Sequence, residues 1–268
     1  MQDKKLKVYY IIRARNAEAT IYAALSSISR DCNTAVIVVV FDRCCDDTLG
    51  EVNRFSKDFD NTVLLMNAVP NGLGGGLITG LKAASDADYV FLLDADDENL
   101  KGRTANQITH MEANDIGICG TSINYFGSRS GECHYPQNDS DIRAVMKIVS
   151  PFANPSVCFS KSAVEKILRL NLFIEDLELF RKLAKDSDVR FGNLDNVYVK
   201  YRVHPNQATA TGIANSREGI SVIGLIIFCL FLISFRRKIS LKLWVARRYF
   251  GLGRLKNVIF CNSHRGRP

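Results

Sequence analysis

Four acidic residues stand within five positions of the segment VFLLDADDENL, directly after an apolar run at residues 90–93. The carboxylates belong to Asp94, Asp96, Asp97 and Glu98. Carboxylates this close repel one another by about 1 kcal/mol per close pair even in water. A divalent cation, alone or with a phosphate group, relieves this repulsion, and carboxylate oxygens suit Mg²⁺ or Mn²⁺ better than Zn²⁺. The alternative is a solvated turn that leads into a helix, where Asp is also favoured.

Three short apolar runs are typical of buried parallel strands, and they span residues 8–12, 35–41 and 89–93. Each is rich in Val, Ile, Leu or aromatic residues and does not alternate cleanly with polar ones. Helical patterns separate the runs, as in AEATIYAALSSI and LITGLKAA. This alternation predicts an α/β fold with a mostly parallel central sheet flanked by helices.

The strand ends are the expected place for a binding site, because sheets of this kind bind ligands beyond the carboxyl ends of their strands. Asp42 closes the second run and Asp94 closes the third. Residues 121–160 are less regular and rich in Gly, Ser, Asn and Pro, so we expect a loop-rich region there. The segments SKSAVEKILRL and IEDLELFRKLAKD then predict two helices.

The composition is that of a globular protein, with 268 residues of which 47% are hydrophobic and 24% charged. The eight cysteines show no metal-binding spacing, and the start MQDKKLKVYY does not resemble a secretory leader. We therefore expect a reduced, cytoplasmic setting.

The net charge of +7 is distributed unevenly. Residues 1–218 hold 25 Lys and Arg against 28 Asp and Glu, whereas residues 219–268 hold 10 Lys and Arg and no acidic residue. A mildly acidic domain is thus followed by a basic tail that needs its own explanation.

Seven segments resemble, in order, the blocks of the family 2 glycosyltransferases, which have the GT-A fold and use nucleotide sugars. They are IIRARNAEATIYAALSSI, VIVVVFDRCCDDTL, NGLGGGLITGLKAA, YVFLLDADD, NPSVCFSKSAVEKI, EDLELFRKLAKD and YRVHPNQAT. The resemblance implies a catalytic domain over residues 1–216. It also implies inverting transfer of a hexose from a nucleotide donor, UDP first, to a glycan or glycolipid acceptor, as in polysaccharide biosynthesis.

The resemblance also implies roles for individual residues. Asp42 would bind uracil, Asp94 would lie near the ribose or the metal, and Asp96 would hold the Mn²⁺ or Mg²⁺ that bridges the diphosphate. The other residues implied in donor binding are Asn16, Glu18, Gly74 and His204. For His204, which precedes a proline, a structural role is the alternative.

The acidic pair Glu175 and Asp176 stands where the family keeps its general base, which would take the proton of the acceptor hydroxyl. The alternative is that both residues complement the dipole at a helix N-terminus.

Three departures from the family pattern stand beside these matches. Arg13-Ala14-Arg15 replaces Pro-Thr-Tyr, Phe41 replaces an Asp, and Asn71 replaces a basic residue. Because of these departures, a catalytically degenerate, membrane-bound partner subunit remains an alternative function. The two arginines leave a nucleotidyltransferase as a second alternative. A dinucleotide-binding loop at GLGGG is disfavoured, because the pattern G-x-G-x-x-G is incomplete.

The tail, residues 217–268, contains the apolar stretch ISVIGLIIFCLFLISF at 220–235. As a helix this stretch reaches about 24 Å, short of the roughly 30 Å of a bilayer core. Basic and aromatic residues follow it, which favours a helix on the cytosolic face of an anionic membrane. The alternative is a buried core or dimer helix. Nucleic-acid binding is disfavoured by the apolar content.

Overall fold

The computed structural model describes residues 6–69, 72–170 and 176–205. Contacts within the chain separate a unit ending at His204 from a second unit beginning at Pro205, and every described helix and strand belongs to the first. The predicted tail and its apolar stretch 220–235 lie outside the described residues. Within the part of the chain that the structure describes, no helix has both the length and the apolarity needed to cross a membrane.

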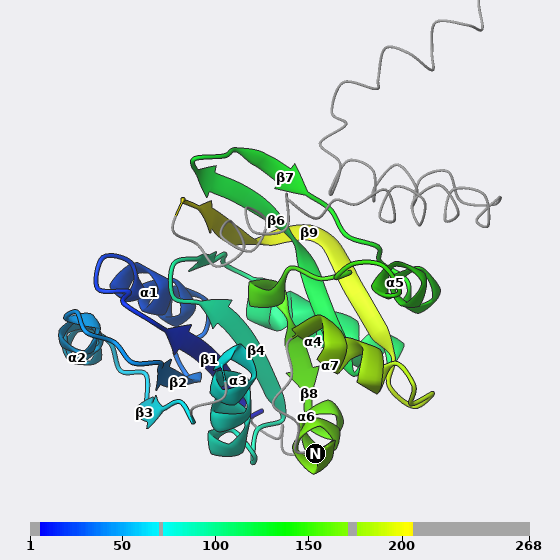
Figure 1. Cartoon of the computed structure of the whole chain (residues 1–268), viewed down its shortest axis with the longest axis horizontal. Coiled ribbons are helices and arrows are strands. Elements are labelled where there is room, and N and C mark those ends of the chain that lie inside the picture. Colours follow the sequence, from blue (N-terminus) through cyan, green and yellow to red (C-terminus); the bar gives the residue numbers. More distant parts are fainter. Residues whose placement is uncertain (1–5, 70–71, 171–175, 206–268) are drawn as a thin grey trace, which may run out of the picture. The chain divides into compact units, whose positions relative to one another are not determined.

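One sheet runs through the first unit in the order β3-β2-β1-β4-β8-β6-β9-β5, with β7 paired to β6 (Figure 1). The strands are β1 (Val8–Ala14), β2 (Val36–Phe41), β3 (Val63–Asn67), β4 (Tyr89–Asp94), β5 (Glu98–Asn99), β6 (Ile118–Gly127), β7 (Gly131–Cys133), β8 (Cys158–Ser160) and β9 (Phe191–Val203). Strands β1 to β4 pair in parallel. Beyond β4, β8 pairs antiparallel with β4 and β6, while β6 and β9 are parallel. The predicted α/β fold is confirmed, and its sheet is parallel in one half and mixed in the other.

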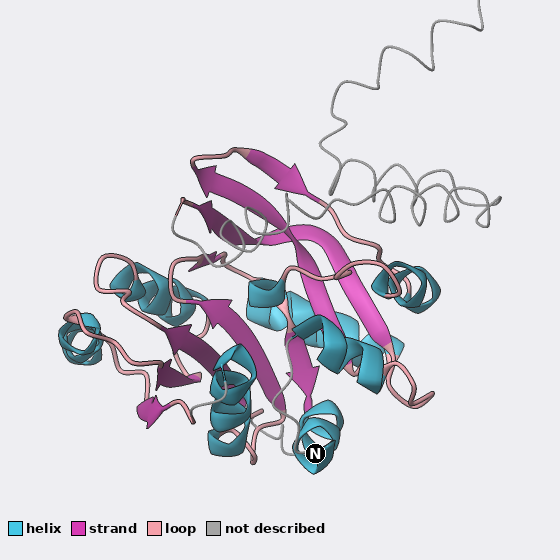
Figure 2. Ribbon diagram, viewed as in Figure 1, coloured by secondary structure: helices cyan, strands magenta, loops and turns pink. Residues whose placement is uncertain are grey.

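Helices lie on both faces of this sheet, and the four predicted helical segments are among them (Figure 2). Their bounds are α1 (Ile21–Asp31), α2 (Thr48–Asp58), α3 (Gly72–Ala83), α4 (Arg103–Asn114), α5 (Asp139–Met146), η1 (Asn154–Ser156), α6 (Lys161–Leu170) and α7 (Asp176–Leu183). Helices on both faces explain why the central strands are apolar without alternation, since neither face of β1 or β4 meets water.

The region expected to be rich in loops instead contains β6, a strand of 10 residues, and helix α5. The apolar signal in β6 is interrupted by Thr121 and Ser122, which are both buried. The backbone N–H of Thr121 donates to the hydroxyl of Ser156 at 3.0 Å, so polar groups are satisfied inside the sheet. Buried polar residues therefore hid a central strand from the sequence pattern.

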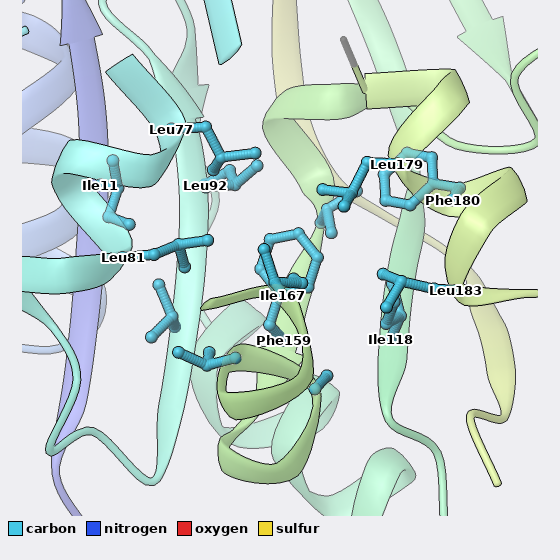
Figure 3. Close-up of a cluster of buried hydrophobic side chains, with 14 of the residues drawn as sticks. Ile11, Leu77, Leu81, Leu92, Ile118, Phe159, Ile167, Leu179, Phe180 and Leu183 are labelled. Carbon is cyan, nitrogen blue, oxygen red and sulfur yellow. The ribbon is translucent and has the colours of Figure 1, made fainter. Parts of the chain in front are cut away.

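Helices α3, α6 and α7 cover one face of the sheet and share a hydrophobic core with it (Figure 3). Leu77 and Leu81 of α3 lie against Ile11 and Leu92 of the sheet in this view. A Cβ added to Gly80 would lie 2.6 Å from the Cγ2 atom of Ile11. The glycines of this helix thus allow it to pack closely on β1.

Helices α1 and α4 are joined to each other on the opposite face. The carboxylate of Asp31, at the end of α1, accepts hydrogen bonds from the backbone N–H groups of Gly102 and Thr104. The side chain of Tyr10 in β1 reaches Thr104 at 2.8 Å and stacks on Phe91 of β4 with ring centroids 4.8 Å apart. These contacts fix β1 and β4 side by side, and the two strands carry the site.

Candidate active site

The site forms where the strand order changes direction, between β1 and β4. Strand β1 pairs in parallel with β2 on one side and β4 on the other. In this register Arg13 is the partner of Asp94, and Ala14 is the partner of Phe41. A crevice at the carboxyl ends of such strands is the usual binding position in open α/β sheets. The topology therefore places the end of the acidic strand β4 at the expected position.

Arg13 joins two of the predicted site residues. Its Nη2 atom lies 3.5 Å from Oδ1 of Asp94, and its Nη1 atom lies 3.8 Å from Oδ1 of Asp176, the first residue of α7. Only 14% of the Arg13 side chain is exposed. A Cβ added to Gly76 would lie 3.3 Å from Cδ of Arg13, so a glycine in α3 leaves the arginine its room. One guanidinium thus holds a donor-site candidate and the base candidate around itself.

The surroundings of Asp94 disfavour the ionised form of its carboxyl group. Burial raises the pKa of Asp94 to about 6, Arg13 opposes the rise, and the negative charges of Asp96 and Asp176 add to it. Lowering the energy of the ionised form requires more positive charge near this carboxylate. The site is therefore suited to a cationic ligand.

The turn after β4 places the next two carboxylates differently. The backbone N–H of Asp97 donates to the carbonyl oxygen of Asp94 at 3.1 Å, which closes the turn. Oδ2 of Asp96 lies 3.1 Å from Nε2 of His204, which follows β9. The predicted residues Asp96 and His204 are thus brought together.

Asp97 is buried, with 2% of its surface exposed. Its Oδ1 accepts a hydrogen bond from the backbone N–H of Arg202 at 2.7 Å, and its Oδ2 has no partner among the described residues. Burial, reinforced by the charges of Asp94 and Asp96, raises the pKa of Asp97 well above its usual range. An unpartnered buried oxygen costs about 1–3 kcal/mol, so the turn is not optimised for stability alone.

Asn16 and Glu18 bind the neighbouring loop in this structure. Asn16 has a positive φ of 49°, which Asn tolerates better than most residues, and its Oδ1 accepts from the backbone N–H of Cys45 at 2.9 Å. Oε2 of Glu18 accepts from the backbone N–H of Asp47 at 2.9 Å. Both side chains fasten the loop after β1 to the loop after β2. Their predicted contact with the donor stays a prediction.

Three further predicted residues have separate positions. Asp42 follows β2, and its Oδ1 accepts from Nε of Arg43 at 2.9 Å. Gly74 is buried in the first turns of α3. Glu175 lies outside the described residues. Their roles in donor and acceptor chemistry also stay predictions.

A divalent cation fits the donor set at the acidic turn. Asp94 and Asp96 offer carboxylate oxygens, and the buried Oδ2 of Asp97 shows an excess of acceptors over donors. Over residues 6–69, 72–170 and 176–205, no group of three or more His, Cys, Asp and Glu side chains could hold a metal ion by itself. Mg²⁺ and similar ions commonly take one or two carboxylates and complete their shell with water and substrate phosphate. The turn matches that kind of incomplete site.

The family of the chain follows from its sequence. Residues 9–168 match the family model described as glycosyl transferase family 2. The chain belongs to glycosyl transferase family 2. The match includes β1, β2, β4 and the acidic turn. No curated protein sequence matches the chain.

Solved structures of low identity share the fold of this family 2 chain. S. aureus TarS 1–349 in complex with UDP-GlcNAc is 15% identical, with a TM-score of 0.60, over 77% of this chain and 61% of that one. The mannosyltransferase PcManGT from Pyrobaculum calidifontis, in complex with GDP-Man and Mn²⁺, is 18% identical, with a TM-score of 0.60, over 80% of this chain and 62% of that one. The family 2 chain thus spans about six tenths of either structure. The likeness confirms the GT-A fold.

Two arginines at the site of this family 2 protein had no role assigned from the sequence. Arg13 appeared only as a departure from the family pattern, and Arg202 only as part of YRVHPNQ. The available signal was position, because Arg13 lies one residue before the end of a buried strand and Arg202 stands two residues before His204. Neither position reveals which residue each side chain contacts, since those partners lie 81 to 163 residues away in sequence.

Proposed function

We propose that the chain is an inverting glycosyltransferase that moves a hexose from a nucleotide donor to a glycan or glycolipid acceptor. The observation that carries the proposal is the convergence of Asp94 and Asp176 on Arg13, at 3.5 and 3.8 Å, beside the acidic turn of a GT-A domain. One guanidinium thus holds a candidate donor-site carboxylate and a candidate base in one place, and such fixed positioning is what a reaction between two bound substrates requires.

We assign different residues of the chain to the donor and to the acceptor. Asp94 and Asp96 would hold Mn²⁺ or Mg²⁺, which neutralises charge on the departing nucleoside diphosphate when it is bound. Asp42, at the same sheet edge, would receive the base of the donor, with uracil as the first candidate. Asp176 would take the proton of the acceptor hydroxyl as that oxygen attacks the anomeric carbon, and Glu175 is the second candidate for this role. A single displacement of this kind inverts the anomeric centre.

Binding and turnover of nucleotide sugars test the proposal. UDP-sugars and GDP-sugars, each with and without Mn²⁺, would be screened by thermal shift, and release of UDP or GDP would then be measured. Mn²⁺-dependent binding with turnover supports a transferase. Binding without turnover would favour the degenerate partner subunit, and release of pyrophosphate from a nucleoside triphosphate would favour a nucleotidyltransferase.

The metal assignment has a sharper test. We expect Asp96→Ala to abolish Mn²⁺-dependent binding of UDP-sugar while the melting temperature without ligand stays close to that of the wild type, because Asp96 is partly exposed. Asp60→Ala removes an exposed carboxylate far from the turn and serves as the control. Unchanged binding and an unchanged metal requirement in Asp96→Ala would remove this residue from the metal site.

We also propose that residues 217–268 attach the domain to the cytosolic face of an anionic membrane. The support is the sequence alone: within this segment, residues 219–268 hold 10 basic residues, no acidic residue and the apolar stretch 220–235. A chain ending at Ser216 should keep donor binding but lose binding to anionic vesicles. High salt should release the full chain only in part, because ions do not screen the apolar contribution. Aggregation of the shortened chain would instead favour a core or dimer helix.

A further inference from the structure

The end of β9 holds Asp96 from two sides. Nε of Arg202 donates to the backbone carbonyl oxygen of Asp96 at 2.9 Å. Nε2 of His204 lies 3.1 Å from Oδ2 of the same residue. Arg202 lies near the end of β9 and His204 directly follows this strand, more than a hundred residues further along the chain. The main chain of Asp96 is therefore restrained by β9, and its carboxylate by the residue that follows β9.

The guanidinium of Arg202 is itself held in place. Arg202 is the register partner of Phe126 across the parallel pair β6 and β9, and its guanidinium carbon lies 4.3 Å from the centre of the Phe126 ring. Its backbone N–H donates to Oδ1 of Asp97 at 2.7 Å. A guanidinium stacked on an aromatic ring keeps its planar donors in one orientation. The Nε–H group is thus aimed at Asp96 before any ligand arrives.

We infer that Arg202 is a positioning residue for the divalent cation and the diphosphate, acting through the orientation of Asp96. The inference rests on the proposed function. Groups that orient metal ligands through a hydrogen bond commonly change metal affinity or activity by about 10- to 100-fold when they are replaced. Arg202 touches neither the cation nor the reacting atoms in this proposal. It fixes the peptide group that joins Asp96 to Asp97. This peptide group is bonded to the Cα atom of Asp96, which carries the carboxylate side chain.

A second arginine, in the turn between β6 and β7, provides a matched control. The guanidinium carbon of Arg129 lies 4.0 Å from the centre of the Tyr125 ring, next to Phe126 in β6. Among the described residues, Arg129 makes no hydrogen bond or ion pair with the acidic turn. Loss of Arg129 therefore removes a comparable aromatic contact and the same charge, but leaves Asp96 untouched.

The experiment compares Arg202→Met, Arg202→Lys and Arg129→Met in the full chain. Met can still pack on Phe126, and the backbone N–H to Asp97 remains, so the fold should survive in Arg202→Met. We measure the melting temperature without ligand, the Kd of UDP and of GDP at saturating Mn²⁺, and the Mn²⁺ concentration that gives half of the UDP- or GDP-dependent stabilisation. Arg202→Met should raise both the Kd and the Mn²⁺ midpoint by about tenfold or more. Arg202→Lys should recover part of the loss, and Arg129→Met should match the wild type.

The outcomes separate the inference from the proposed function. Absence of Mn²⁺-dependent binding of UDP and GDP in the wild type overturns both. Binding in the wild type with an unchanged Mn²⁺ midpoint in Arg202→Met overturns the positioning role alone, as does an equal loss in Arg129→Met. If Arg202→Met does not fold, Arg202→Lys decides: a folded Lys variant with the wild-type Mn²⁺ midpoint and Kd overturns the role, and a raised midpoint supports it.

Discussion

Arginines on the two faces of the β1–β4 pair have opposite surroundings. Arg103, on the face covered by α1 and α4, is fully buried and donates only to neutral oxygens. Its acceptors are the carbonyl oxygens of Leu92 at 3.1 Å and Val157 at 3.5 Å, Oδ1 of Asn99 at 3.1 Å and Oε1 of Gln107 at 3.2 Å. Arg13, on the face covered by α3, lies instead between the carboxylates of Asp94 and Asp176.

The two regions differ in how well donors and acceptors are matched. The guanidinium of Arg103 fits acceptors that α4 and the neighbouring parts of the sheet hold in place. Burial lowers the pKa of Arg103, but from a value so high that the side chain stays charged. At the end of β4 the carboxylates outnumber their partners, and Oδ2 of Asp97 is buried with no partner among the described residues. We therefore expect the matched region, around Arg103, to stabilise the fold, and the unmatched region, at the acidic turn, to gain stability when a ligand binds.

Among the changes near Arg13, loss of the candidate base Asp176 should reduce the rate of transfer the most. Asp176→Asn keeps the shape of the side chain but cannot accept the proton, so the rate of transfer should fall by about 10²–10⁴-fold while donor affinity holds. Single-turnover rates and the Kd of the donor check this. Glu178→Gln, an exposed change in the same turn of α7, is the control. Normal transfer in Asp176→Asn would move the role of base to Glu175 or elsewhere.

Replacement of Arg103 should lower the stability of the fold. Arg103→Met removes the donor from four buried oxygens. Each such loss costs about 1–3 kcal/mol, so the free energy of unfolding should fall by about 3 kcal/mol or more. Urea unfolding measures the change. Arg54→Met is the control, because Arg54 is exposed, pairs with Glu51 at 3.0 Å and lies over Tyr22, and it should cost below about 1 kcal/mol. A similarly small loss for Arg103→Met would contradict the contrast between the two faces.

Asp94→Asn should change the free energy of unfolding by a smaller amount and should raise it. The pKa of Asp94 in the folded chain is about 6, above the ordinary value of 3.8. Between these values the folded state keeps a proton that the unfolded chain has lost, so the stability of the wild type falls as the pH rises through this window. Asp94→Asn has no ionisable group at this position, so its stability does not fall in this pH window for that reason. It should match the wild type near pH 4 and exceed it by on the order of 1–2 kcal/mol above pH 6, after allowance for solvent screening.

Unfolding of Asp94→Asn by urea at a series of pH values, with EDTA present, measures this difference. Asp186→Asn is the control of opposite sign, because a hydrogen bond from Lys166 holds the pKa of Asp186 below its usual value. Removal of that carboxylate should lower stability at neutral pH. A variant of Asp94 that is less stable than the wild type above pH 6 would show that the pair with Arg13 stabilises the fold.

The sequence predicted the parallel half of the sheet better than the mixed half. Strands β1, β2 and β4 are continuous apolar runs because helices cover both of their faces, and this pattern is visible locally. Strand β6 escaped prediction because Thr121 and Ser122 satisfy their polar groups inside the sheet. Its pairing with β9 joins segments about 75 residues apart in the register Ile118 to Phe191, which no local pattern reports.

The sequence alone determined the family, the α/β order and the presence of Asp94, Asp96 and Asp176 at element ends. Residue types and their spacing record such features, because strand and helix periods are local properties of the chain. Only the tertiary structure decided that Arg13 lies between Asp94 and Asp176, and that Arg202 and His204 hold Asp96. Those contacts depend on which strands are neighbours and in which register, and register is fixed by packing over the whole sheet.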